Sequence, residues 1–567
     1  MMFSIVIPTR ARADTLRHAV RTVLAQTDGD FEVIVHESGD DPATAAAVAE
    51  FDDPRIGFFK TGEPVRMTEN WERALAHVRG DYVLFIGDDD GLLPDACAIA
   101  RGILQAHPNE ILSWPFASYY WPRYFDPEMA NRLSAASGEK LLCTLKDSRL
   151  LLELFYRFRA SYVDLPMIYN SFVSRRVIER ARALRGHYFI GSYPDVSSAV
   201  VNLFFSREFI HCNRPLSVNA ASHHSTGHGL VKSGDPVVQA RVTAAAFGTI
   251  PIHPTMVPSA DLTISMANEM LITKQELFPD EEPQLEYGRM LEEAARRISE
   301  IPNQYDIVLA SCRAIAARNA IEFDESHLLP RELLPKAQRR DRREVAAGTV
   351  FIDLDGAARG FENVFDAVTA LAGQLPLAGP SVFVAETPPV REIGGVGKES
   401  ITIDFSQRGN GALLLGRGWS VIEHWGVWSI GTRAEITFPI AAKFSGSIML
   451  HLIGSVFLPP RNLSLCIKLG TRILLKRHLV ANEGRVAIEL LPVEIERSES
   501  AKRLDLVIGI SEAKTPMETG LCPDPRRVGF GLERIAIWAS EPPRSRLGAT
   551  SRLLRKLLLG SGELTPG

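Results

Sequence analysis

Three consecutive aspartates, Asp88, Asp89 and Asp90, directly follow the apolar run "DYVLFIG" of residues 81–87. Such a run predicts a buried strand, so the three carboxylates stand at its carboxyl end, where like charges repel one another. A solvated acidic turn is the ordinary explanation for a short acidic cluster, but a turn needs only one or two such residues. Mg²⁺ and Mn²⁺ bind carboxylate oxygens, and Mg²⁺ combines one or two of them with substrate phosphates. The cluster therefore favours a metal and diphosphate site over a plain turn.

The elements before the aspartates predict how the cluster is positioned. Short apolar or β-branched runs at 3–8, 31–38, 55–61 and 81–87 alternate with segments whose apolar residues recur at helical spacing. This alternation predicts a mostly parallel sheet with helices on both faces. In such sheets ligands bind at the carboxyl ends of the strands, which is where the aspartates lie.

Composition limits the classes of function. The 567 residues are 46% hydrophobic and 23% charged, with a net charge of −5, which indicates a globular chain of two to four domains and disfavours nucleic acid as a partner. Six scattered cysteines include no CxxC pair, the N-terminus reads as a strand, and no apolar stretch reaches the ~18 residues of a membrane span. These features predict a cytoplasmic protein.

The pattern of charged and apolar residues changes twice after residue 250. Charged, helical sequence predicts a connector and linker over 251–390, and short alternating strands predict an antiparallel β-sandwich over 397–541. A basic, leucine-rich tail at 542–567 is a candidate for peripheral contact with an anionic membrane, with a docked terminal helix as the alternative. The first domain is expected over 1–250.

The N-terminal motifs resemble those of a known family. "FSIVIPTRARADTLRHAVRTVLAQTDGDFEVIV" and "ENWERALAHVRGDYVLFIGDDDGLLPD" are similar, in this order, to the family 2 glycosyltransferases over residues 1–230. The resemblance implies the α/β fold called GT-A and inverting transfer of a sugar from a nucleotide-diphospho-sugar donor, a UDP- or GDP-sugar, with Mn²⁺ or Mg²⁺ bound.

The resemblance also assigns candidate roles to single residues. Aligned on "LPD", Asp89 falls on the metal-binding aspartate with Asp90 in support, Asp88 contacts the donor ribose or the metal, and Gly87 stands where the family has a further aspartate. The candidate donor-binding residues are Pro8, Thr9, Arg10, Glu37, Ser38, Asn70 and Asp88, with Ser38 in place of the family's usual carboxylate. Trp71 is expected in the core rather than at the donor.

Two further candidates follow the strand predicted at 167–173. Asp195, at the predicted helix start "YPDVSSAV", matches the family's catalytic base, and an N-cap is the alternative interpretation. His224 lies with His223 and His228 in the loop "SHHSTGHG" and is a candidate third metal ligand, with a solvated loop histidine as the alternative.

The predicted sandwich carries the candidate glycan-binding residues Trp419, Glu423, Trp425 and Trp428, although tryptophans also fill sandwich cores. The sandwich also resembles a module that accompanies bacterial glycan-assembly proteins. The predicted function is transfer to a glycan, polysaccharide or lipid-linked acceptor. One alternative is a nucleotidyltransferase of the same fold. The other is a non-catalytic glycan-binding scaffold with a degenerate transferase domain, which Gly87 and Ser38 support because they stand where the family has carboxylates.

Overall fold

The computed structural model divides the chain into two compact units, Met1–Thr387 and a second one that contains the strands between Ile401 and Ala539. The structure describes residues 1–225, 248–259, 261–298, 304–323, 325, 328, 348–376, 379–384, 401–406, 409–420, 422–423, 425–439, 446–456, 463–469, 472–479, 485–489, 493–495, 503–510 and 528–539. The predicted basic tail at 542–567 lies outside these residues. Of the helices within them, none is both long enough and apolar enough to cross a membrane.

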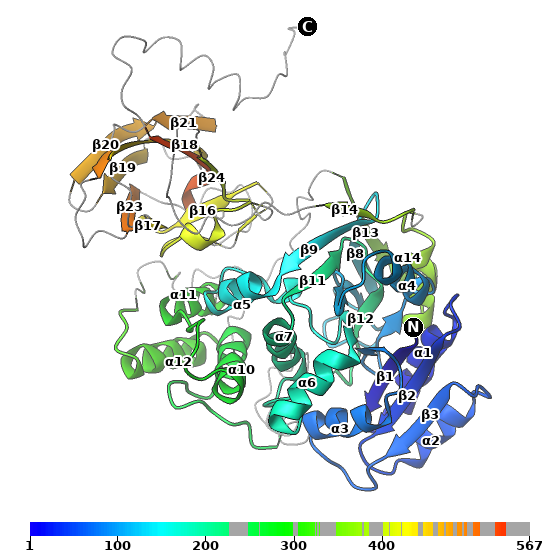
Figure 1. Cartoon of the computed structure of the whole chain (residues 1–567). Helices are drawn as coiled ribbons and strands as arrows, with labels where there is room; N and C mark the ends of the chain where they lie inside the picture. The colour runs from blue at the N-terminus through cyan, green and yellow to red at the C-terminus, as the bar shows by residue number, and fades with distance from the viewer. Residues whose placement is uncertain are drawn as a thin grey trace, which may run out of the picture. The chain divides into compact units, whose positions relative to one another are not determined.

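The first unit is built on a nine-stranded sheet in the order β14-β9-β11-β6-β10-β4-β1-β2-β3 (Figure 1). Its strands are β1 (Phe3–Thr9), β2 (Phe31–Glu37), β3 (Ile56–Lys60), β4 (Tyr82–Phe85), β6 (Ile111–Ser113), β9 (Leu142–Asp147), β10 (Ser171–Ser174), β11 (Glu208–Cys212) and β14 (Val382–Val384). The neighbours β4, β1, β2 and β3 are parallel, as the sequence predicts. The sheet is mixed because β10 runs antiparallel to both β4 and β6.

Helices pack against this sheet because the apolar residues of each helix recur on one side, which is buried against the strands. They are α1 (Ala13–Leu24), α2 (Pro42–Ala49), α3 (Met67–Ala74), α4 (Ala96–Ala106), α5 (Ser148–Tyr156), α6 (Arg175–Arg185) and α7 (Pro194–Phe205), with short 3₁₀ turns η1 (Leu75–His77) and η2 (Tyr162–Asp164). In α1 the buried residues include Leu16, Ala19, Val20 and Val23, at the predicted helical spacing. Every residue of β1 and of β2 is buried, as expected of strands covered on both faces.

A second sheet contains the strand that directly follows the aspartate turn. Its order is β13-β8-β7-β12-β5, with bounds β5 (Gly91–Leu92), β7 (Ala117–Tyr120), β8 (Arg132–Gly138), β12 (Ser217–Ala221) and β13 (Thr349–Asp355). Strand β5 begins directly after Asp90 and pairs with β12. The aromatic stretch at 110–125, for which the sequence predicts no element, supplies β6, β7 and the buried Trp121.

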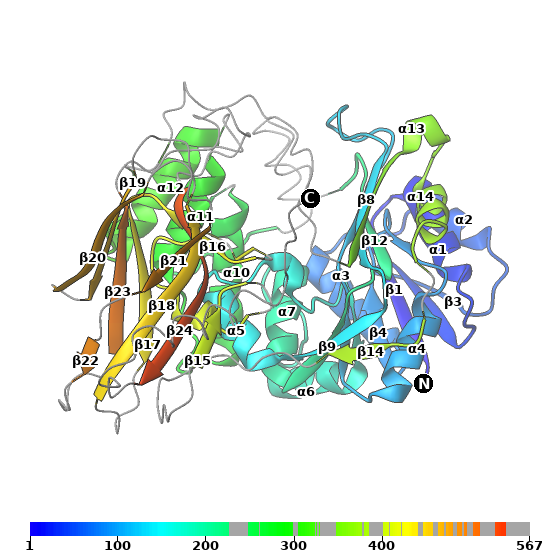
Figure 2. The same ribbon diagram turned by 90° about the horizontal axis from the view of Figure 1, so that it is seen from above.

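The described residues between 251 and 384 are part of the first unit rather than a separate connector. Their helices are α10 (Leu262–Leu277), α11 (Tyr287–Ile298), α12 (Tyr305–Arg318), α13 (Gly356–Arg359) and α14 (Val364–Ala372). Helix α10 packs on α7 and α14 on α1, while β13 pairs with β8 and β14 with β9 (Figure 2). The many charged residues of this segment led to the prediction of a connector. The buried side of its helices is apolar, and in α11 it includes Met290, Leu291 and Ala294.

The second unit consists of two antiparallel sheets around one core. One contains β15 (Ile401–Asp404), β16 (Val427–Ile430), β18 (Gly446–Val456), β21 (Arg485–Glu489), β22 (Val493–Ile495) and β24 (Val528–Ala539), and the other contains β17 (Arg433–Pro439), β19 (Leu463–Leu469), β20 (Arg472–Leu479) and β23 (Arg503–Ile510). A 3₁₀ turn, η5 (Ala412–Leu414), precedes β16. Leu452 and Ile535 of one sheet share a buried cluster with Ile436 and Ile508 of the other. Short strands that alternate apolar and polar residues therefore form the sandwich that their period predicts.

A glycine pair tests the packing of α14 on the aspartate turn. A Cβ atom on Gly91 would lie 2.5 Å from Val368 Cγ2 and 3.0 Å from Val364 Cγ2, whereas one on Gly102 of α4 meets nothing within 4 Å. We expect Gly91→Ala to destabilise the first unit by about 1–3 kcal/mol through overpacking. Gly102→Ala should leave stability unchanged or raise it by up to about 1 kcal/mol. Urea unfolding of both variants checks this, and equal midpoints would mean that α14 is not fixed against β5.

Candidate active site

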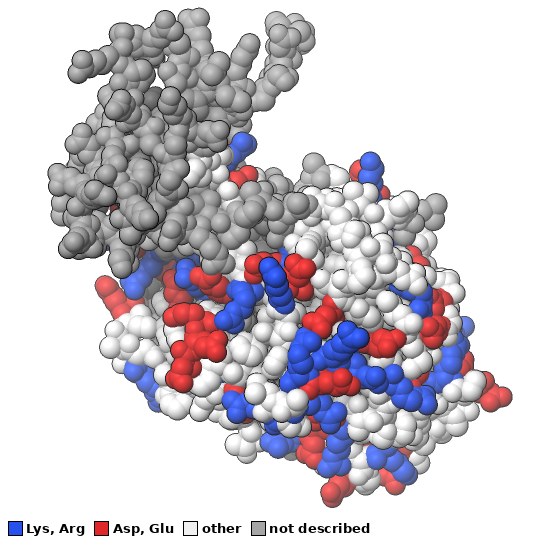
Figure 3. Space-filling model, in the orientation of Figure 1, with Lys and Arg blue, Asp and Glu red and all other residues white. Residues whose placement is uncertain are grey.

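A cavity of about 1160 Å³ in the first unit joins the aspartate turn to the start of α7. Its wall includes Asp88, Asp89 and Asp90 together with Asp195, so the structure brings together carboxylates that lie more than 100 positions apart in the sequence. Arg12 is the one lysine or arginine among the described lining residues. On the face drawn in Figure 3, lysines and arginines mix with acids over the first unit, so charge of a single sign does not dominate that face.

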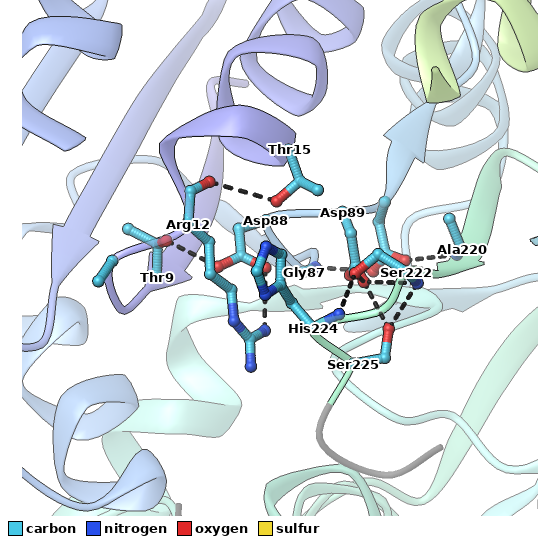
Figure 4. A network of polar contacts seen from close by, with 12 residues as sticks. Thr9, Arg12, Thr15, Gly87, Asp88, Asp89, Ala220, Ser222, His224 and Ser225 are labelled. Atoms are coloured by element: carbon cyan, nitrogen blue, oxygen red, sulfur yellow. Dashed lines mark hydrogen bonds and ion pairs between the residues drawn. The ribbon is translucent and has the colours of Figure 1, made fainter. Parts of the chain in front are cut away.

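Asp88 is held by the end of β1 and by α1. Thr9 Oγ1 donates to Asp88 Oδ2 at 2.7 Å, and Arg12 Nη1 lies 3.2 Å from Asp88 Oδ1 (Figure 4). Burial raises the pKa of Asp88 although Arg12 lies beside it. The side chain is 2% exposed, so a hydroxyl and a guanidinium replace water around this carboxylate.

Asp90 is a structural residue of the turn. Its Oδ2 accepts the N–H of Gly87 at 2.7 Å, and its Oδ1 accepts the N–H of Ala220 in β12 at 2.6 Å. A hydrogen bond from Tyr169 adds to these, while burial and the charge of Asp89 raise the pKa of Asp90. Both oxygens of Asp90 accept hydrogen bonds from backbone N–H groups and so fix the turn, and the supporting role of Asp90 at a metal stays a prediction.

Gly87 has a steric reason for being glycine. A Cβ atom there would lie 2.6 Å from the Tyr169 hydroxyl and 2.9 Å from Asp90 Oδ2. The Tyr169 ring stacks on Trp71 with 5° between the ring planes. Trp71 is 7% exposed and belongs to the core, and it also borders the cavity. The carboxylate that the family resemblance leads us to expect at residue 87 is therefore replaced by a tyrosine hydroxyl reaching in from another segment.

Asp89 faces hydroxyl groups that follow β12. Its Oδ2 accepts hydrogen bonds from Ser222 Oγ at 2.7 Å, Ser225 Oγ at 2.5 Å and the N–H of Ser222 at 3.1 Å. Trp121 Nε1 donates to its carbonyl oxygen at 3.0 Å. Figure 4 shows Ser222 and Ser225 beside Asp89, on the side away from Arg12.

The aspartate turn fits a hard divalent cation. The donors around Asp88 and Asp89 include the hydroxyl oxygens of Thr9, Ser222 and Ser225, which are hard ligands like the carboxylates themselves. Three buried carboxylates face one guanidinium, so the turn carries excess negative charge that a divalent ion would neutralise.

The other candidate donor-binding residues have structural contacts. Pro8 lines the cavity. The carboxylate of Glu37 accepts the N–H of Ala11 at 3.2 Å, and burial raises the pKa of Glu37. Ser38 Oγ exchanges hydrogen bonds of 3.0 Å with the backbone of Val65.

Asn70 also binds the protein rather than the cavity. Its Oδ1 lies 2.7 Å from His36 Nδ1, and its Nδ2 donates to the carbonyl oxygen of His36 at 3.1 Å. Arg10 is exposed and is not among the residues that line the cavity. Arg12, two positions further, takes the place beside the aspartates.

Asp195 does not cap its helix in the usual way. The N-cap of α7 is Tyr193, whose side chain makes no capping hydrogen bond, and Pro194 takes the first helical position. Asp195 Oδ1 accepts the N–H of Val196 at 2.9 Å, and Oδ2 accepts a short hydrogen bond from the Tyr162 hydroxyl. Burial raises the pKa of Asp195, and the Tyr162 hydrogen bond lowers it in part. The carboxylate lines the cavity and is therefore placed to accept a proton from a bound molecule.

A buried carboxylate on α10 holds the loop before Asp195. Glu269 is fully buried, and its oxygens accept the N–H groups of Ser192, at 3.0 and 3.1 Å, and of Tyr193, at 3.1 Å. Gly191 has φ +68° and lies so close that a Cβ atom would come within 2.3 Å of Glu269 Oε1. Burial raises the pKa of Glu269 to about 8. Helix α10 thus fixes the backbone from which Asp195 projects.

His224 contacts Asp14 of α1 and the segment after β12. Its Nε2 lies 3.2 Å from Asp14 Oδ2, and its backbone N–H donates to Ser222 Oγ at 3.1 Å. The set of Asp89, Asp90 and His224 expected from the sequence is therefore not assembled here, because His224 pairs with α1. His228 lies outside the described residues.

The candidate glycan-binding tryptophans of the second unit separate into two groups. Trp419 is fully buried and donates from Nε1 to the carbonyl oxygen of Glu435 at 2.7 Å, so it is a core residue that cannot stack on a ligand. Trp425 and Trp428 are partly exposed, with ring centroids 5.0 Å apart, and Trp425 Nε1 donates to Glu423 at 3.0 Å.

Sequence reasoning missed Tyr162, Tyr169, Ser222, Ser225 and Glu269. Only the tertiary fold brings them to the aspartates or to the loop before Asp195, and their sequence neighbourhoods resemble ordinary loops or helices. Arg12 carried a signal, since "PTRARAD" places several arginines at the end of a strand, but sequence alone does not choose between Arg10 and Arg12.

Comparison with known proteins finds a family model that matches the N-terminal part of this chain. Residues 4–169 match the family model described as glycosyl transferase family 2. Among solved structures the chain is similar to residues 1–349 of S. aureus TarS in complex with UDP-GlcNAc, at 13% identity over 57% of this chain and 93% of that one, with a TM-score of 0.33. It is also similar to the longer S. aureus TarS structure (9% identity, 90% and 72% coverage, TM-score 0.29) and to the mannosyltransferase PcManGT from Pyrobaculum calidifontis in complex with GDP-Man and Mn²⁺ (14%, 56% and 86%, 0.28). The aspartate turn lies within the matched residues, and residues 4–169 therefore match a glycosyl transferase family 2 domain.

Proposed function

We propose that this glycosyltransferase is metal-dependent and inverting, and that the cavity holds the nucleotide-sugar donor at the aspartate turn and the acceptor beside Asp195. One observation carries the proposal: a single cavity is lined at once by the three buried aspartates and by a separate carboxylate with a raised pKa. Direct displacement on a sugar needs this arrangement, because the departing diphosphate and the attacking hydroxyl lie on opposite sides of the reacting carbon.

The residues of the chain divide the work as follows. Asp89, with Asp88, would hold the divalent ion, which when bound neutralises charge on the diphosphate. Arg12 adds a fixed positive charge at the same end of the cavity. Asp195 removes the proton of the acceptor hydroxyl, and its raised pKa makes it a stronger base than an ordinary aspartate. Tyr162 and Glu269 position Asp195 through its carboxylate and its loop.

Among the three predicted acceptor classes, the cavity wall favours a lipid-linked one. Val163, Ile252, Leu262 and Ile307 line the cavity and are 49%, 37%, 39% and 60% exposed. Exposed aliphatic side chains in the wall of one cavity mark a surface that binds apolar groups. An acceptor whose hydroxyl reaches Asp195 would lay an adjoining alkyl chain across this rim.

The non-catalytic alternative loses one of its two supports. Gly87 looked like a lost carboxylate, but the Tyr169 hydroxyl fills that space, so glycine is a steric requirement of this turn. Ser38 remains a difference from the family pattern, and it bears on the nucleotide base rather than on the chemistry.

Removal of one charge tests the donor site. With Mn²⁺ present, we expect UDP or GDP to stabilise the wild-type protein by about 2.7 kcal/mol at a hundredfold excess over Kd. Asp89→Asn keeps the size of the side chain and should abolish this stabilisation and lower nucleotide-sugar turnover about a hundredfold. Asp52→Asn, at an exposed acid, is the matched control. The proposal fails if the wild type binds neither nucleotide, or if Asp89→Asn behaves like the control.

The hydrogen bond from Tyr162 predicts a shift in the pH profile. Asp195 must be deprotonated to act as a base, so kcat/KM falls as the pH drops through its pKa. The hydroxyl of Tyr162 lowers that pKa, and its loss in Tyr162→Phe should move the acidic limb to higher pH. Tyr193→Phe, in the same cavity wall, should leave the position of the limb unchanged. An unmoved limb in Tyr162→Phe would mean that a group other than Asp195 titrates there.

The apolar rim predicts a dependence on alkyl chain length. Across methyl, octyl and dodecyl glycosides of a sugar that the enzyme accepts, KM should fall with length, by at most about fourfold per buried CH₂. Ile307→Asp should flatten this dependence while leaving the KM for the donor unchanged. Ile473→Asp, at an isoleucine 56% exposed in the second unit, is the control. A wild-type KM that does not change with alkyl chain length would contradict a lipid-linked acceptor.

A further inference from the structure

Asp14, His223 and His224 form a cluster beside the aspartate turn, outside the set assigned to the donor. Asp14 lies in the first turn of α1, and the two histidines follow β12. One ligand atom from each of the three residues lies within 4.8 Å of the others, and no other group of three such donors occurs among the residues that the structure describes. The two imidazole centroids are 3.8 Å apart, so both rings face the same carboxylate region.

The chemistry of this cluster differs from that of the aspartate turn. Two imidazoles and one carboxylate suit Zn²⁺, Co²⁺ or Ni²⁺, whereas Mg²⁺ prefers oxygen donors alone. Ligand distances of 2.0–2.1 Å in a tetrahedral site place donors roughly 3.4 Å apart, and His224 Nε2 already lies 3.2 Å from Asp14 Oδ2. The side chains of Asp14 and His224 are 58% and 34% exposed, so an ion can reach them and a small rotation can bring in His223.

We propose that Asp14, His223 and His224 bind a transition-metal ion of the Zn²⁺ type, at a site separate from the aspartate turn. His224 Nε2 lies 3.2 Å from Asp14 Oδ2 on α1, and Asp88, Asp89 and Asp90 are not part of this group of ligand atoms. Three protein ligands leave a fourth position for water.

The ion would join the two segments that hold the aspartates. Helix α1 starts next to Arg12, which binds Asp88, and the segment after β12 carries Ser222 and Ser225, which bind Asp89. Ser222 Oγ also accepts the backbone N–H of His224, so the histidine backbone and Asp89 share one hydroxyl (Figure 4). An ion fixed between Asp14 and the histidines therefore restrains the partners of Asp88 and Asp89. Binding of the ion does not depend on the proposed function. Only the consequence for a donor bound at Asp88 and Asp89 rests on that function.

Direct titration with the metal alone tests the site. Full-length protein freed of any polyhistidine tag and of metal is titrated with Zn²⁺ by calorimetry and with Co²⁺ by visible absorption. We expect a Zn²⁺ site of micromolar or tighter Kd and the intense bands of four-coordinate Co²⁺. His223→Ala and His224→Ala should each weaken binding at least tenfold, with thermal midpoints of the metal-free proteins unchanged.

Two controls decide where the ion binds. His187→Ala removes a histidine whose Nε2 also lies 3.2 Å from a carboxylate oxygen, that of Glu276, and whose side chain is 38% exposed, so it should leave Zn²⁺ affinity unchanged. Asp89→Asn should leave it unchanged as well. The proposal is overturned if the wild type binds Zn²⁺ no tighter than the His223→Ala, His224→Ala double variant. It is equally overturned if Asp89→Asn loses Zn²⁺ as His224→Ala does.

Discussion

The burial of three consecutive carboxylates at the end of β4 is the constraint on which the first unit depends. Each is at most 5% exposed, and the cost of removing such charges from water must be offset by fixed donors. Those donors come from β1 and α1 for Asp88, from the segment after β12 for Asp89, and from the backbone of Gly87 and Ala220 for Asp90. The second sheet and α14, which supports its strand β5, therefore position the chemistry as much as they complete the fold.

At the opposite end of the cavity, Glu269 and Asp195 are two further carboxylates whose surroundings differ. Glu269 is buried completely and serves the backbone at Ser192 and Tyr193, while Asp195 keeps a path to the cavity and a single hydroxyl partner. Two acids with raised pKa thus differ in role because one is surrounded by backbone N–H groups and the other borders open space. Helix α10, which carries Glu269, belongs to the segment whose charged surface had suggested a connector.

The candidate residues that sequence reasoning placed correctly at the cavity, Pro8, Asp88, Asp89 and Asp195, stand at ends of strands or starts of helices. Other candidates stay predictions because they are not among the lining residues: Thr9, Arg10, Glu37, Ser38, Asn70 and His224. In the second unit the alternating strands were recognisable, and Trp419 follows the core alternative that the sequence left open for these tryptophans. The sequence does not say which tryptophan is buried, because a tryptophan beside glycines has the same local sequence in a core as at a surface.

The sequence by itself determined the parallel strands β1–β4, the sandwich and the position of the aspartates, because hydrophobic period and strand ends are local properties. It also carried the family resemblance that residues 4–169 bear out. Tertiary structure alone decided that Tyr169 fills the place beside Gly87, that Tyr162 and Glu269 serve Asp195, and that His224 pairs with Asp14. These are contacts between segments far apart in the chain, and their free energy depends on burial and distance, which no local pattern of residues records.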